Sequence, residues 1–262
     1  MKTVGDICAL LEEFAPLSLQ ESYDNAGLIL GNPAQVVTGV LIALDVTDAV
    51  LDEAIELGCN VIITHHPLIF AGIKHINGKN HTEQCLIKAI KNDLALYAGH
   101  TNVDSVRGGV NDRMADKLKL SERCLLSNSG NTQSETGLGI VGYLPKSYSE
   151  IEFLELVQTT FHSQRIKHSK LNGRNIRKVA LCGGAGSNFL ETAQKSGADV
   201  FLTGESKYHE FFVQADDILL VDAGHYETEQ YTKEVFFELL SKKLPTFAVR
   251  ISAVESNPVH YF

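Results

Sequence analysis

Two adjacent histidines, His65 and His66, are the residues of this chain whose type and position most favour metal chemistry. They follow residues 61–64, a predicted strand, and Pro67 then prevents the strand from continuing. Functional groups of α/β folds gather at the carboxyl ends of strands. Because adjacent side chains diverge at a strand end, this pair can reach two neighbouring metal ions. The alternative is a capped strand with one buried and one exposed histidine.

A histidine and a glutamate four residues apart follow a second predicted strand at 218–222. If His225 opens a long helix, His225 and Glu229 share one face of it, about 5–6 Å apart at Cβ. Helices present paired metal ligands at this spacing. A surface ion pair would have the same spacing, so the pattern gains weight from its duplicate, His100 with Asp104.

Alternating strands and helices are expected to position these side chains. In the first half we predict strands at 40–44, 61–64 and 94–97 and helices at 48–57 and 83–92, with Thr47 as an N-cap and Gly58 as a helix stop. In the second half we predict strands at 137–144, 179–182, 200–203 and 218–222 and helices at 149–161 and 189–196. This order predicts an α/β fold with mostly parallel or mixed sheets covered by helices.

The two halves also resemble each other in sequence. Residues 40–64 align with residues 179–203 without a gap, and six of these positions are identical. An Ala-Gly-His sequence followed four residues after its histidine by a carboxylate occurs in both halves, at 98–104 and 223–229. We infer an internal duplication that gives two similar α/β lobes, 1–126 and 127–262, interleaved into one compact unit. The polar stretch 127–134 is the predicted linker.

The duplication is asymmetric at the predicted site, because His65 and His66 align with Gly204 and Glu205. Strand ends from both halves are expected to meet at one edge. The predicted metal ligands are His65, His66, Asp104, His225 and Glu229. Imidazole and carboxylate without thiolate favour Zn, Mn, Fe or Co, and two ions about 3.5–4 Å apart would activate water for hydrolysis. For His100, ligation and a substrate-contacting, catalytic role are both open.

Three further features have competing interpretations. The Gly-rich residues 183–187 lack the third glycine of a dinucleotide motif, so a tight turn competes with an anion-binding loop. His209 lies in a loop that mirrors the His65-His66 loop and is the predicted general acid or base there, with a surface charge as the alternative. Arg107 could pair with a phosphate or carry a surface charge.

Composition excludes several classes of protein. A net charge of −9 and the absence of Lys or Arg runs argue against a general nucleic-acid binder. The five cysteines form no Cys-x-x-Cys pair, which favours reduced thiols and the cytoplasm. The first residues lack the apolar segment of a signal peptide, and no apolar stretch reaches membrane-spanning length. We therefore expect a cytoplasmic protein without membrane contact.

Five segments together give the chain its resemblance to a known family. They are 23–28 (YDNAGL), 64–67 (THHP), 100–104 (HTNVD), 183–186 (GGAG) and 224–229 (GHYETE). With these the chain resembles the NIF-three-like family, the GTP cyclohydrolase 1 type 2 homologs, nearly end to end. The resemblance implies two divalent metal ions per subunit at the five ligand positions, two α/β lobes and a ring-shaped homohexamer.

The resemblance also implies a function. The expected activity is that of a metal-dependent hydrolase acting on a small molecule, nucleotide-like or phosphorylated. The alternative is a non-catalytic protein that binds metal and acts in regulation or metal handling.

Overall fold

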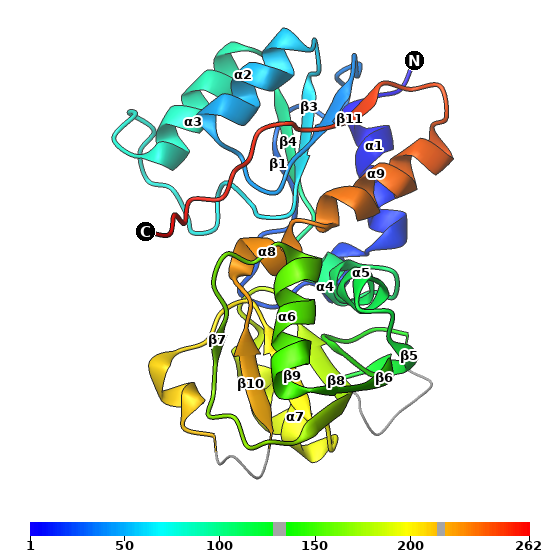
Figure 1. The fold of residues 1–262 in the computed structure, drawn as a ribbon. Coiled ribbons are helices and arrows are strands. Elements are labelled where there is room, and N and C mark those ends of the chain that lie inside the picture. Colours follow the sequence, from blue (N-terminus) through cyan, green and yellow to red (C-terminus); the bar gives the residue numbers. More distant parts are fainter. Residues whose placement is uncertain (128–134, 214–217) are drawn as a thin grey trace. The chain divides into compact units, whose positions relative to one another are not determined.

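The computed structural model describes residues 1–127, 135–213 and 218–262, so most of the predicted linker lies outside the described residues (Figure 1). It divides into two compact units. The first contains residues 1–103 and 232–258, and the second contains residues 104–231 and 259–262. The boundaries of these units differ from the predicted boundary between residues 126 and 127. The chain passes between them three times, at 103/104, at 231/232 and at 258/259.

The first unit is a five-stranded sheet with helices on both faces (Figure 1). Its strands are β1 (Gly27–Leu30), β2 (Val40–Ile42), β3 (Val61–Thr64), β4 (Ala95–Ala98) and β11 (Val249–Ile251). Its helices are α1 (Val4–Phe14), α2 (Asp48–Glu56), α3 (His81–Lys91) and α9 (Thr232–Lys243), with a 3-10 turn η1 (Leu17–Leu19). The order is β1-β4-β3-β2-β11, with β1 antiparallel to β4 and the other pairs parallel.

Local sequence signals explain these elements. Thr47 caps α2 by accepting a hydrogen bond from the Val50 N–H, and Gly58 follows the helix with a φ of 67°, as predicted. Leu41, Ile62 and Leu96 pack in one core cluster with side chains from α2 and α3. Alternate residues of the same strands point to the opposite face, where Figure 1 shows α1 and α9.

The second unit is a six-stranded sheet. Its strands are β5 (Ser121–Leu125), β6 (Ile140–Ser149), β7 (Lys167–His168), β8 (Asn175–Cys182), β9 (Val200–Thr203) and β10 (Leu219–Asp222). Its helices are α5 (Val110–Lys117), α6 (Glu150–Phe161), α7 (Leu190–Lys195) and α8 (His225–Glu229), with 3-10 turns η2 (Gly186–Phe189) and η3 (Tyr208–Phe211). The order is β5-β6-β8-β9-β10-β7, with β8, β9 and β10 parallel. A short helix α4 (Thr101–Asp104) spans the first passage between the units.

Both faces of the second sheet are buried. Val179 and Leu181 contribute to a cluster that contains side chains of α5 and α6, whereas Ala180 and Cys182 contribute to a cluster with Ala193 of α7. The alternation along β8 therefore explains why its last four residues form a continuous apolar run. The predicted α/β fold of two similar lobes is confirmed.

The internal duplication is visible in the strand register. Val40 of β2 pairs with Val61, and Val179 of β8 pairs with Val200, so aligned residues occupy equivalent ladder positions. The strand orders β1-β4-β3-β2 and β7-β10-β9-β8 are also equivalent, each with its first strand antiparallel. Each unit then adds strands of its own, β11 in the first and β5 with β6 in the second.

The repeated Ala-Gly-His sequences are one residue out of register in the two sheets. Ala98 pairs with Thr64, whereas Asp222 pairs with Thr203, so Ala98 is equivalent to Asp222. His100 is thus the second residue after its strand and His225 the third. The extra residue, Gly224, has a φ of 100°. The prediction that His225 opens a long helix was wrong, because α8 ends at Glu229 and α9 begins separately at Thr232.

All five cysteines are free thiols, and Cys124 is the one that is not fully buried. Burial raises the pKa of the Cys8 thiol to about 11 and also raises the pKa of Cys59, Cys85 and Cys182. Among the residues that the structure describes, no helix has the length and apolar character needed to span a bilayer.

These thiols predict a simple labelling result. In the native protein a disulfide reagent such as DTNB should react first with Cys124, because it is the cysteine that is not fully buried and because burial raises the pKa of the other four thiols. Denaturation should release the other four thiols. Cys124→Ser should remove the fast phase, and a fast phase that survives in this variant would contradict the burial of the remaining cysteines.

Candidate metal centre

The His65-His66 pair is fixed at the end of β3 by its own backbone. The N–H groups of both histidines donate to the carbonyl oxygen of Leu44, at 3.2 and 3.1 Å. The Thr64 hydroxyl donates to the His66 carbonyl at 2.8 Å. His65 is fully buried and His66 is partly exposed. The backbone therefore holds two adjacent imidazoles in a defined arrangement, with ring centroids 5.0 Å apart.

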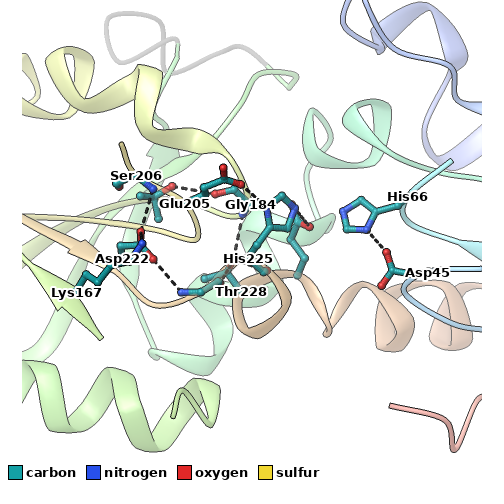
Figure 2. Close-up of polar contacts among 12 residues, drawn as sticks. Asp45, His66, Lys167, Gly184, Glu205, Ser206, Asp222, His225 and Thr228 are labelled. Atoms are coloured by element: carbon teal, nitrogen blue, oxygen red, sulfur yellow. Dashed lines mark hydrogen bonds and ion pairs between the residues drawn. The ribbon is translucent and has the colours of Figure 1, made fainter. Parts of the chain in front are cut away.

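Each imidazole of the pair is oriented through its Nδ1 atom. His65 Nδ1 lies 2.8 Å from the Gly99 carbonyl oxygen, and His66 Nδ1 lies 2.7 Å from Asp45 Oδ1 (Figure 2). Both oxygens accept hydrogen bonds, so Nδ1 carries the proton and Nε2 presents its lone pair. Asp45 is itself held by the Ser256 hydroxyl at 2.8 Å. This is the arrangement by which proteins prepare histidines for metal binding.

His100 has the same kind of support from a distant part of the chain. Its Nδ1 lies 2.7 Å from Asp24 Oδ1, and the side chain of Asp24 is completely buried. The backbone and hydroxyl of Thr101 and the backbone of Asn25 also donate to this carboxylate. Burial alone would raise the pKa of Asp24, but the hydrogen bonds from His100 and Thr101 outweigh it and hold the pKa well below its usual range.

The pKa of Asp45, the aspartate that accepts the His66 N–H, is lowered as well. Burial acts to raise the pKa of Asp45, and the hydrogen bond from His66 overcomes it, so the net shift is downward. The carboxylate form is thereby favoured as the partner of the imidazole N–H.

The three histidines of the first unit converge. Each of His65, His66 and His100 offers a ligand nitrogen, and these nitrogens lie within 4.8 Å of one another. Three imidazoles whose Nδ1 atoms are all engaged by acceptors form a nitrogen donor set suited to a divalent transition metal.

The second unit carries its own donor set. His225 Nε2 lies 3.0 Å from Glu229 Oε2, and His225 Nδ1 lies 3.1 Å from Glu205 Oε2 (Figure 2). Glu229 is almost fully buried, whereas Glu205 is exposed. The predicted i,i+4 pair is therefore formed on α8, and Glu205 orients its imidazole.

Asp104 belongs to the same region of the second unit. The Cys182 thiol is buried, which raises its pKa, and the charges of Asp104 and Glu229 raise it further. Both carboxylates thus act on one buried thiol near the end of β8. Glu229 is buried and Asp104 is half-buried, so a cation bound beside them would offset the cost of burying their charge.

The Gly-rich loop after β8 supports the carboxylate ligand. The Gly183 N–H donates to Asn111 at 3.0 Å and the Gly184 N–H donates to Thr228 at 3.1 Å (Figure 2). These donors hold neighbouring side chains, which favours the tight turn over the anion-binding loop. A Cβ on Gly184 would lie 1.9 Å from Glu229 Oε1, so only glycine leaves room for this carboxylate.

Another glycine explains why the second unit lacks a histidine pair. Gly204 is aligned with His65, and a Cβ on Gly204 would lie 2.4 Å from the Thr228 hydroxyl and 2.9 Å from the Gly224 carbonyl oxygen. The start of α8 occupies the space that a side chain would need. The next residue, Glu205, is aligned with His66 and contacts His225 instead.

Two other candidates from the sequence have different surroundings. Arg107 forms a two-pronged ion pair with Asp112, from Nε at 2.8 Å and from a terminal nitrogen at 3.1 Å. His209 is exposed on η3, where its ring stacks on Phe212 with centroids 6.1 Å apart. The structure gives neither residue a direct link to the donor sets described above.

Sequence reasoning missed Asp24 and Asp45 as the residues that orient His100 and His66. Asp24 stands in the YDNAGL segment, where an acidic residue carries no spacing signal toward His100, 76 residues away. Asp45 follows the predicted strand 40–44 directly, so its place at a strand end was the available signal.

Comparison with known proteins assigns the family. A family model described as Duf34/NIF3 (NGG1p interacting factor 3) matches residues 2–258. The chain therefore belongs to the DUF34/NIF3 family. A Clostridium acetobutylicum protein named "GTP cyclohydrolase 1 type 2 homolog" is 36% identical over 242 residues, covering 92% of this chain and 89% of the relative. A Streptococcus pneumoniae relative of the same name is 33% identical and covers 98% of both chains.

Solved structures show the same fold. A Bacillus cereus protein related to NIF3 superimposes with a TM-score of 0.89 at 26% identity, over 99% of both chains. Reduced HcgD from Methanocaldococcus jannaschii superimposes with a TM-score of 0.80 at 29% identity, covering 96% of this chain and 98% of that one.

The contact between Gly184 and Glu229 yields a prediction with a matched control. Gly184→Ala and Gly197→Ala both place a side chain at positive φ, 57° and 71°, and both should cost about 1–2 kcal/mol of stability. A Cβ at Gly197 comes no closer than 3.9 Å to any atom of the protein, Lys178 Nζ. Only Gly184→Ala should therefore weaken metal binding, measured by calorimetric titration with Zn²⁺. Equal affinities in the two variants would contradict a ligand role for Glu229.

Proposed function

We propose that this protein binds two divalent metal ions through His65, His66, Asp104, His225 and Glu229. The observation that carries the proposal is the orientation of the imidazoles: His65, His66 and His225 each direct Nδ1 at an oxygen acceptor. His225 Nε2 lies against the carboxylate of Glu229, another proposed ligand. The carboxylates of Asp104 and Glu229 add the oxygen donors. A mixed nitrogen and oxygen set without thiolate favours Zn, Mn, Fe or Co.

Two of the proposed ligands lie close in sequence to passages of the chain between the units. The first passage between the units, 103/104, directly precedes Asp104, and the second, 231/232, comes two residues after Glu229. His100 lies four residues before Asp104. Asp104 and Glu229 are thus close in sequence to the connections between the units, whereas His65 and His66 are not.

We propose hydrolysis as the reaction class, with a small nucleotide-like or phosphorylated molecule as substrate. Divalent ions held by such ligands activate water and stabilise the negative charge that develops during hydrolysis. The chain's own residues would fix the ions: Asp45 and Glu205 orient His66 and His225, and Gly184 positions Glu229. The name shared by the curated relatives supports GTP as the first substrate to test.

Several expectations from the sequence and from the family resemblance accompany this proposal. They are the ring-shaped homohexamer, the cytoplasmic location and the catalytic use of His209. The alternative function, a non-catalytic protein that binds metal for regulation or metal handling, shares the same ligands and differs in turnover alone.

Metal content and turnover test the proposal together. We expect two equivalents of metal per chain, and hydrolysis of GTP or of a member of a phosphoester panel by the metal-loaded protein. His66→Ala should abolish turnover and reduce the metal content, while His75→Ala, which changes an exposed histidine of the same unit, should alter neither. Two bound equivalents without turnover of any compound would favour the non-catalytic alternative, and one equivalent or none would overturn the dinuclear centre.

The aspartate behind His66 gives a graded prediction. Asp45→Asn keeps the size of the side chain but weakens the acceptor for the imidazole N–H. Metal affinity should fall about 10–100-fold, as is usual when a group that orients a metal-bound histidine is lost. The measurement is competition with a chelating dye of known affinity. Asp48→Asn, at an exposed position of the adjoining helix, is the control.

A further inference from the structure

We propose that the first unit has a nucleotide-binding site in which the planar base stacks on Tyr23 and Phe70 and the phosphate lies near Lys74. The inference rests on the proposed function, because it names the substrate class of that function. All three residues belong to the first unit, and none of them is a proposed metal ligand.

A cavity lies against the loop between β3 and α3. It has a volume of about 420 Å³ and is lined by residues 68–75 together with Asn80, Thr82 and Glu83. Small-molecule sites in proteins have volumes of about 300–1,000 Å³, so the cavity has the size that a mononucleotide needs. Every lining residue belongs to the first unit, so this unit forms the cavity by itself.

Two exposed aromatic side chains form a platform at this cavity. Phe70, which lines the cavity, is 52% exposed, and Tyr23 is 63% exposed. Their ring centroids are 6.3 Å apart and the rings are tilted by 50°. A base stacked on one ring would therefore meet the edge of the other, and both contacts are favourable between aromatic groups. Every nucleobase has a π-face, so such a platform fits a planar base better than an aliphatic group.

The aromatic platform is held in place beside His100. The Phe70 ring lies edge-on to the His100 ring, with centroids 6.1 Å apart. The side-chain amide of Asn25 donates to the Ile69 carbonyl oxygen at 2.6 Å. This bond joins the turn that carries Tyr23 to the loop that carries Phe70. Because the platform is fixed before a ligand arrives, binding has less side-chain entropy to remove.

The charge in the cavity that has no partner is positive. Glu83 accepts hydrogen bonds from the backbone N–H groups of Asn77 and Lys79, at 3.0 and 2.9 Å, so this carboxylate is engaged within the loop. Lys74 lines the same cavity and forms no hydrogen bond or ion pair with any residue that the structure describes. An ammonium group binds phosphate as a point charge. The cavity therefore favours an anionic group next to the aromatic platform.

A contact between copies of the chain would also cover exposed aromatic rings. Such a contact would need neither a cavity of nucleotide size beside the rings nor an ammonium group within it. The combination of Phe70 and Lys74 around one cavity thus favours the nucleotide over a second copy of the chain.

The experiment measures the binding of GMP and guanosine to the full chain by calorimetric titration. Phe70→Ala should weaken the binding of both compounds about 5–100-fold, the range expected when an aromatic stacking partner is lost. Phe70→Tyr keeps the ring and should bind like the parent protein. Lys74→Gln should weaken GMP binding about 2–5-fold and leave guanosine binding unchanged, because guanosine has no phosphate.

Ile76→Ala is the matched control, since Ile76 is an exposed apolar residue of the same loop that does not line the cavity. It should bind both compounds like the parent protein. Far-UV circular dichroism checks that each variant has folded. The absence of GMP binding by the parent protein, or equal affinities in the parent and in Phe70→Ala, would overturn the inference.

Metal content separates this inference from the proposed function. Phe70→Ala should keep the metal content of the parent protein, because phenylalanine offers no ligand atom. Phe70-dependent GMP binding by a chain that holds no metal would support the inference while the proposed function failed. Two bound metal ions with turnover, but with GMP affinity unchanged in Phe70→Ala, would overturn the inference alone. A changed molecular mass of Phe70→Ala in sedimentation would place the ring at a contact between copies and would also overturn it.

Discussion

One backbone carbonyl determines how the candidate metal centre of the first unit is built. The Leu44 oxygen accepts hydrogen bonds from both His65 and His66, so the strand β3 ends in two consecutive residues tied to the same point. Leu44 can serve both only because β2 and β3 run parallel in a fixed register, Val40 opposite Val61. A slip of one residue would exchange the faces of both strands and separate the histidines from their acceptors. The register of the sheet thus determines which hydrogen bonds hold His65 and His66 at the end of β3.

The hydrogen-bond acceptors around these histidines fix the tautomer and the orientation of each imidazole ring. A neutral imidazole can be protonated on either nitrogen, and a free side chain samples both forms and several rotamers. Oxygen atoms of Gly99, Asp45 and Asp24 select the Nδ1 form and restrict the rings before any ion arrives. Folding therefore already removes part of the side-chain conformational entropy that metal binding would otherwise have to remove. Because geometry is already set, selection among metals depends more on coordination preference than on overall affinity.

Sequence patterns predicted the elements better than the contacts between them. Alternating apolar segments with Thr47 and Gly58 located α2 and its neighbouring strands to within two residues, because caps and strand runs are local signals. The five proposed ligands were found from strand ends and spacing. The partners of His66 and His100 lie 21 and 76 residues away, and nothing local encodes those contacts. The sequence also did not reveal the one-residue shift at Gly224. The two identical Ala-Gly-His sequences suggested that His100 and His225 occupy equivalent positions after their strands.

The clash at Gly204 has an evolutionary consequence. The repeat position that holds His65 in one half is filled in the other half by the start of α8, which carries His225 and Glu229. A half-length ancestor that assembled from two identical chains could have had either the histidine or this helix start at that position, but not both. Fusion of the two copies allowed each to specialise. Because of the clash at Gly204, a single substitution there cannot give the second half the histidine of the first.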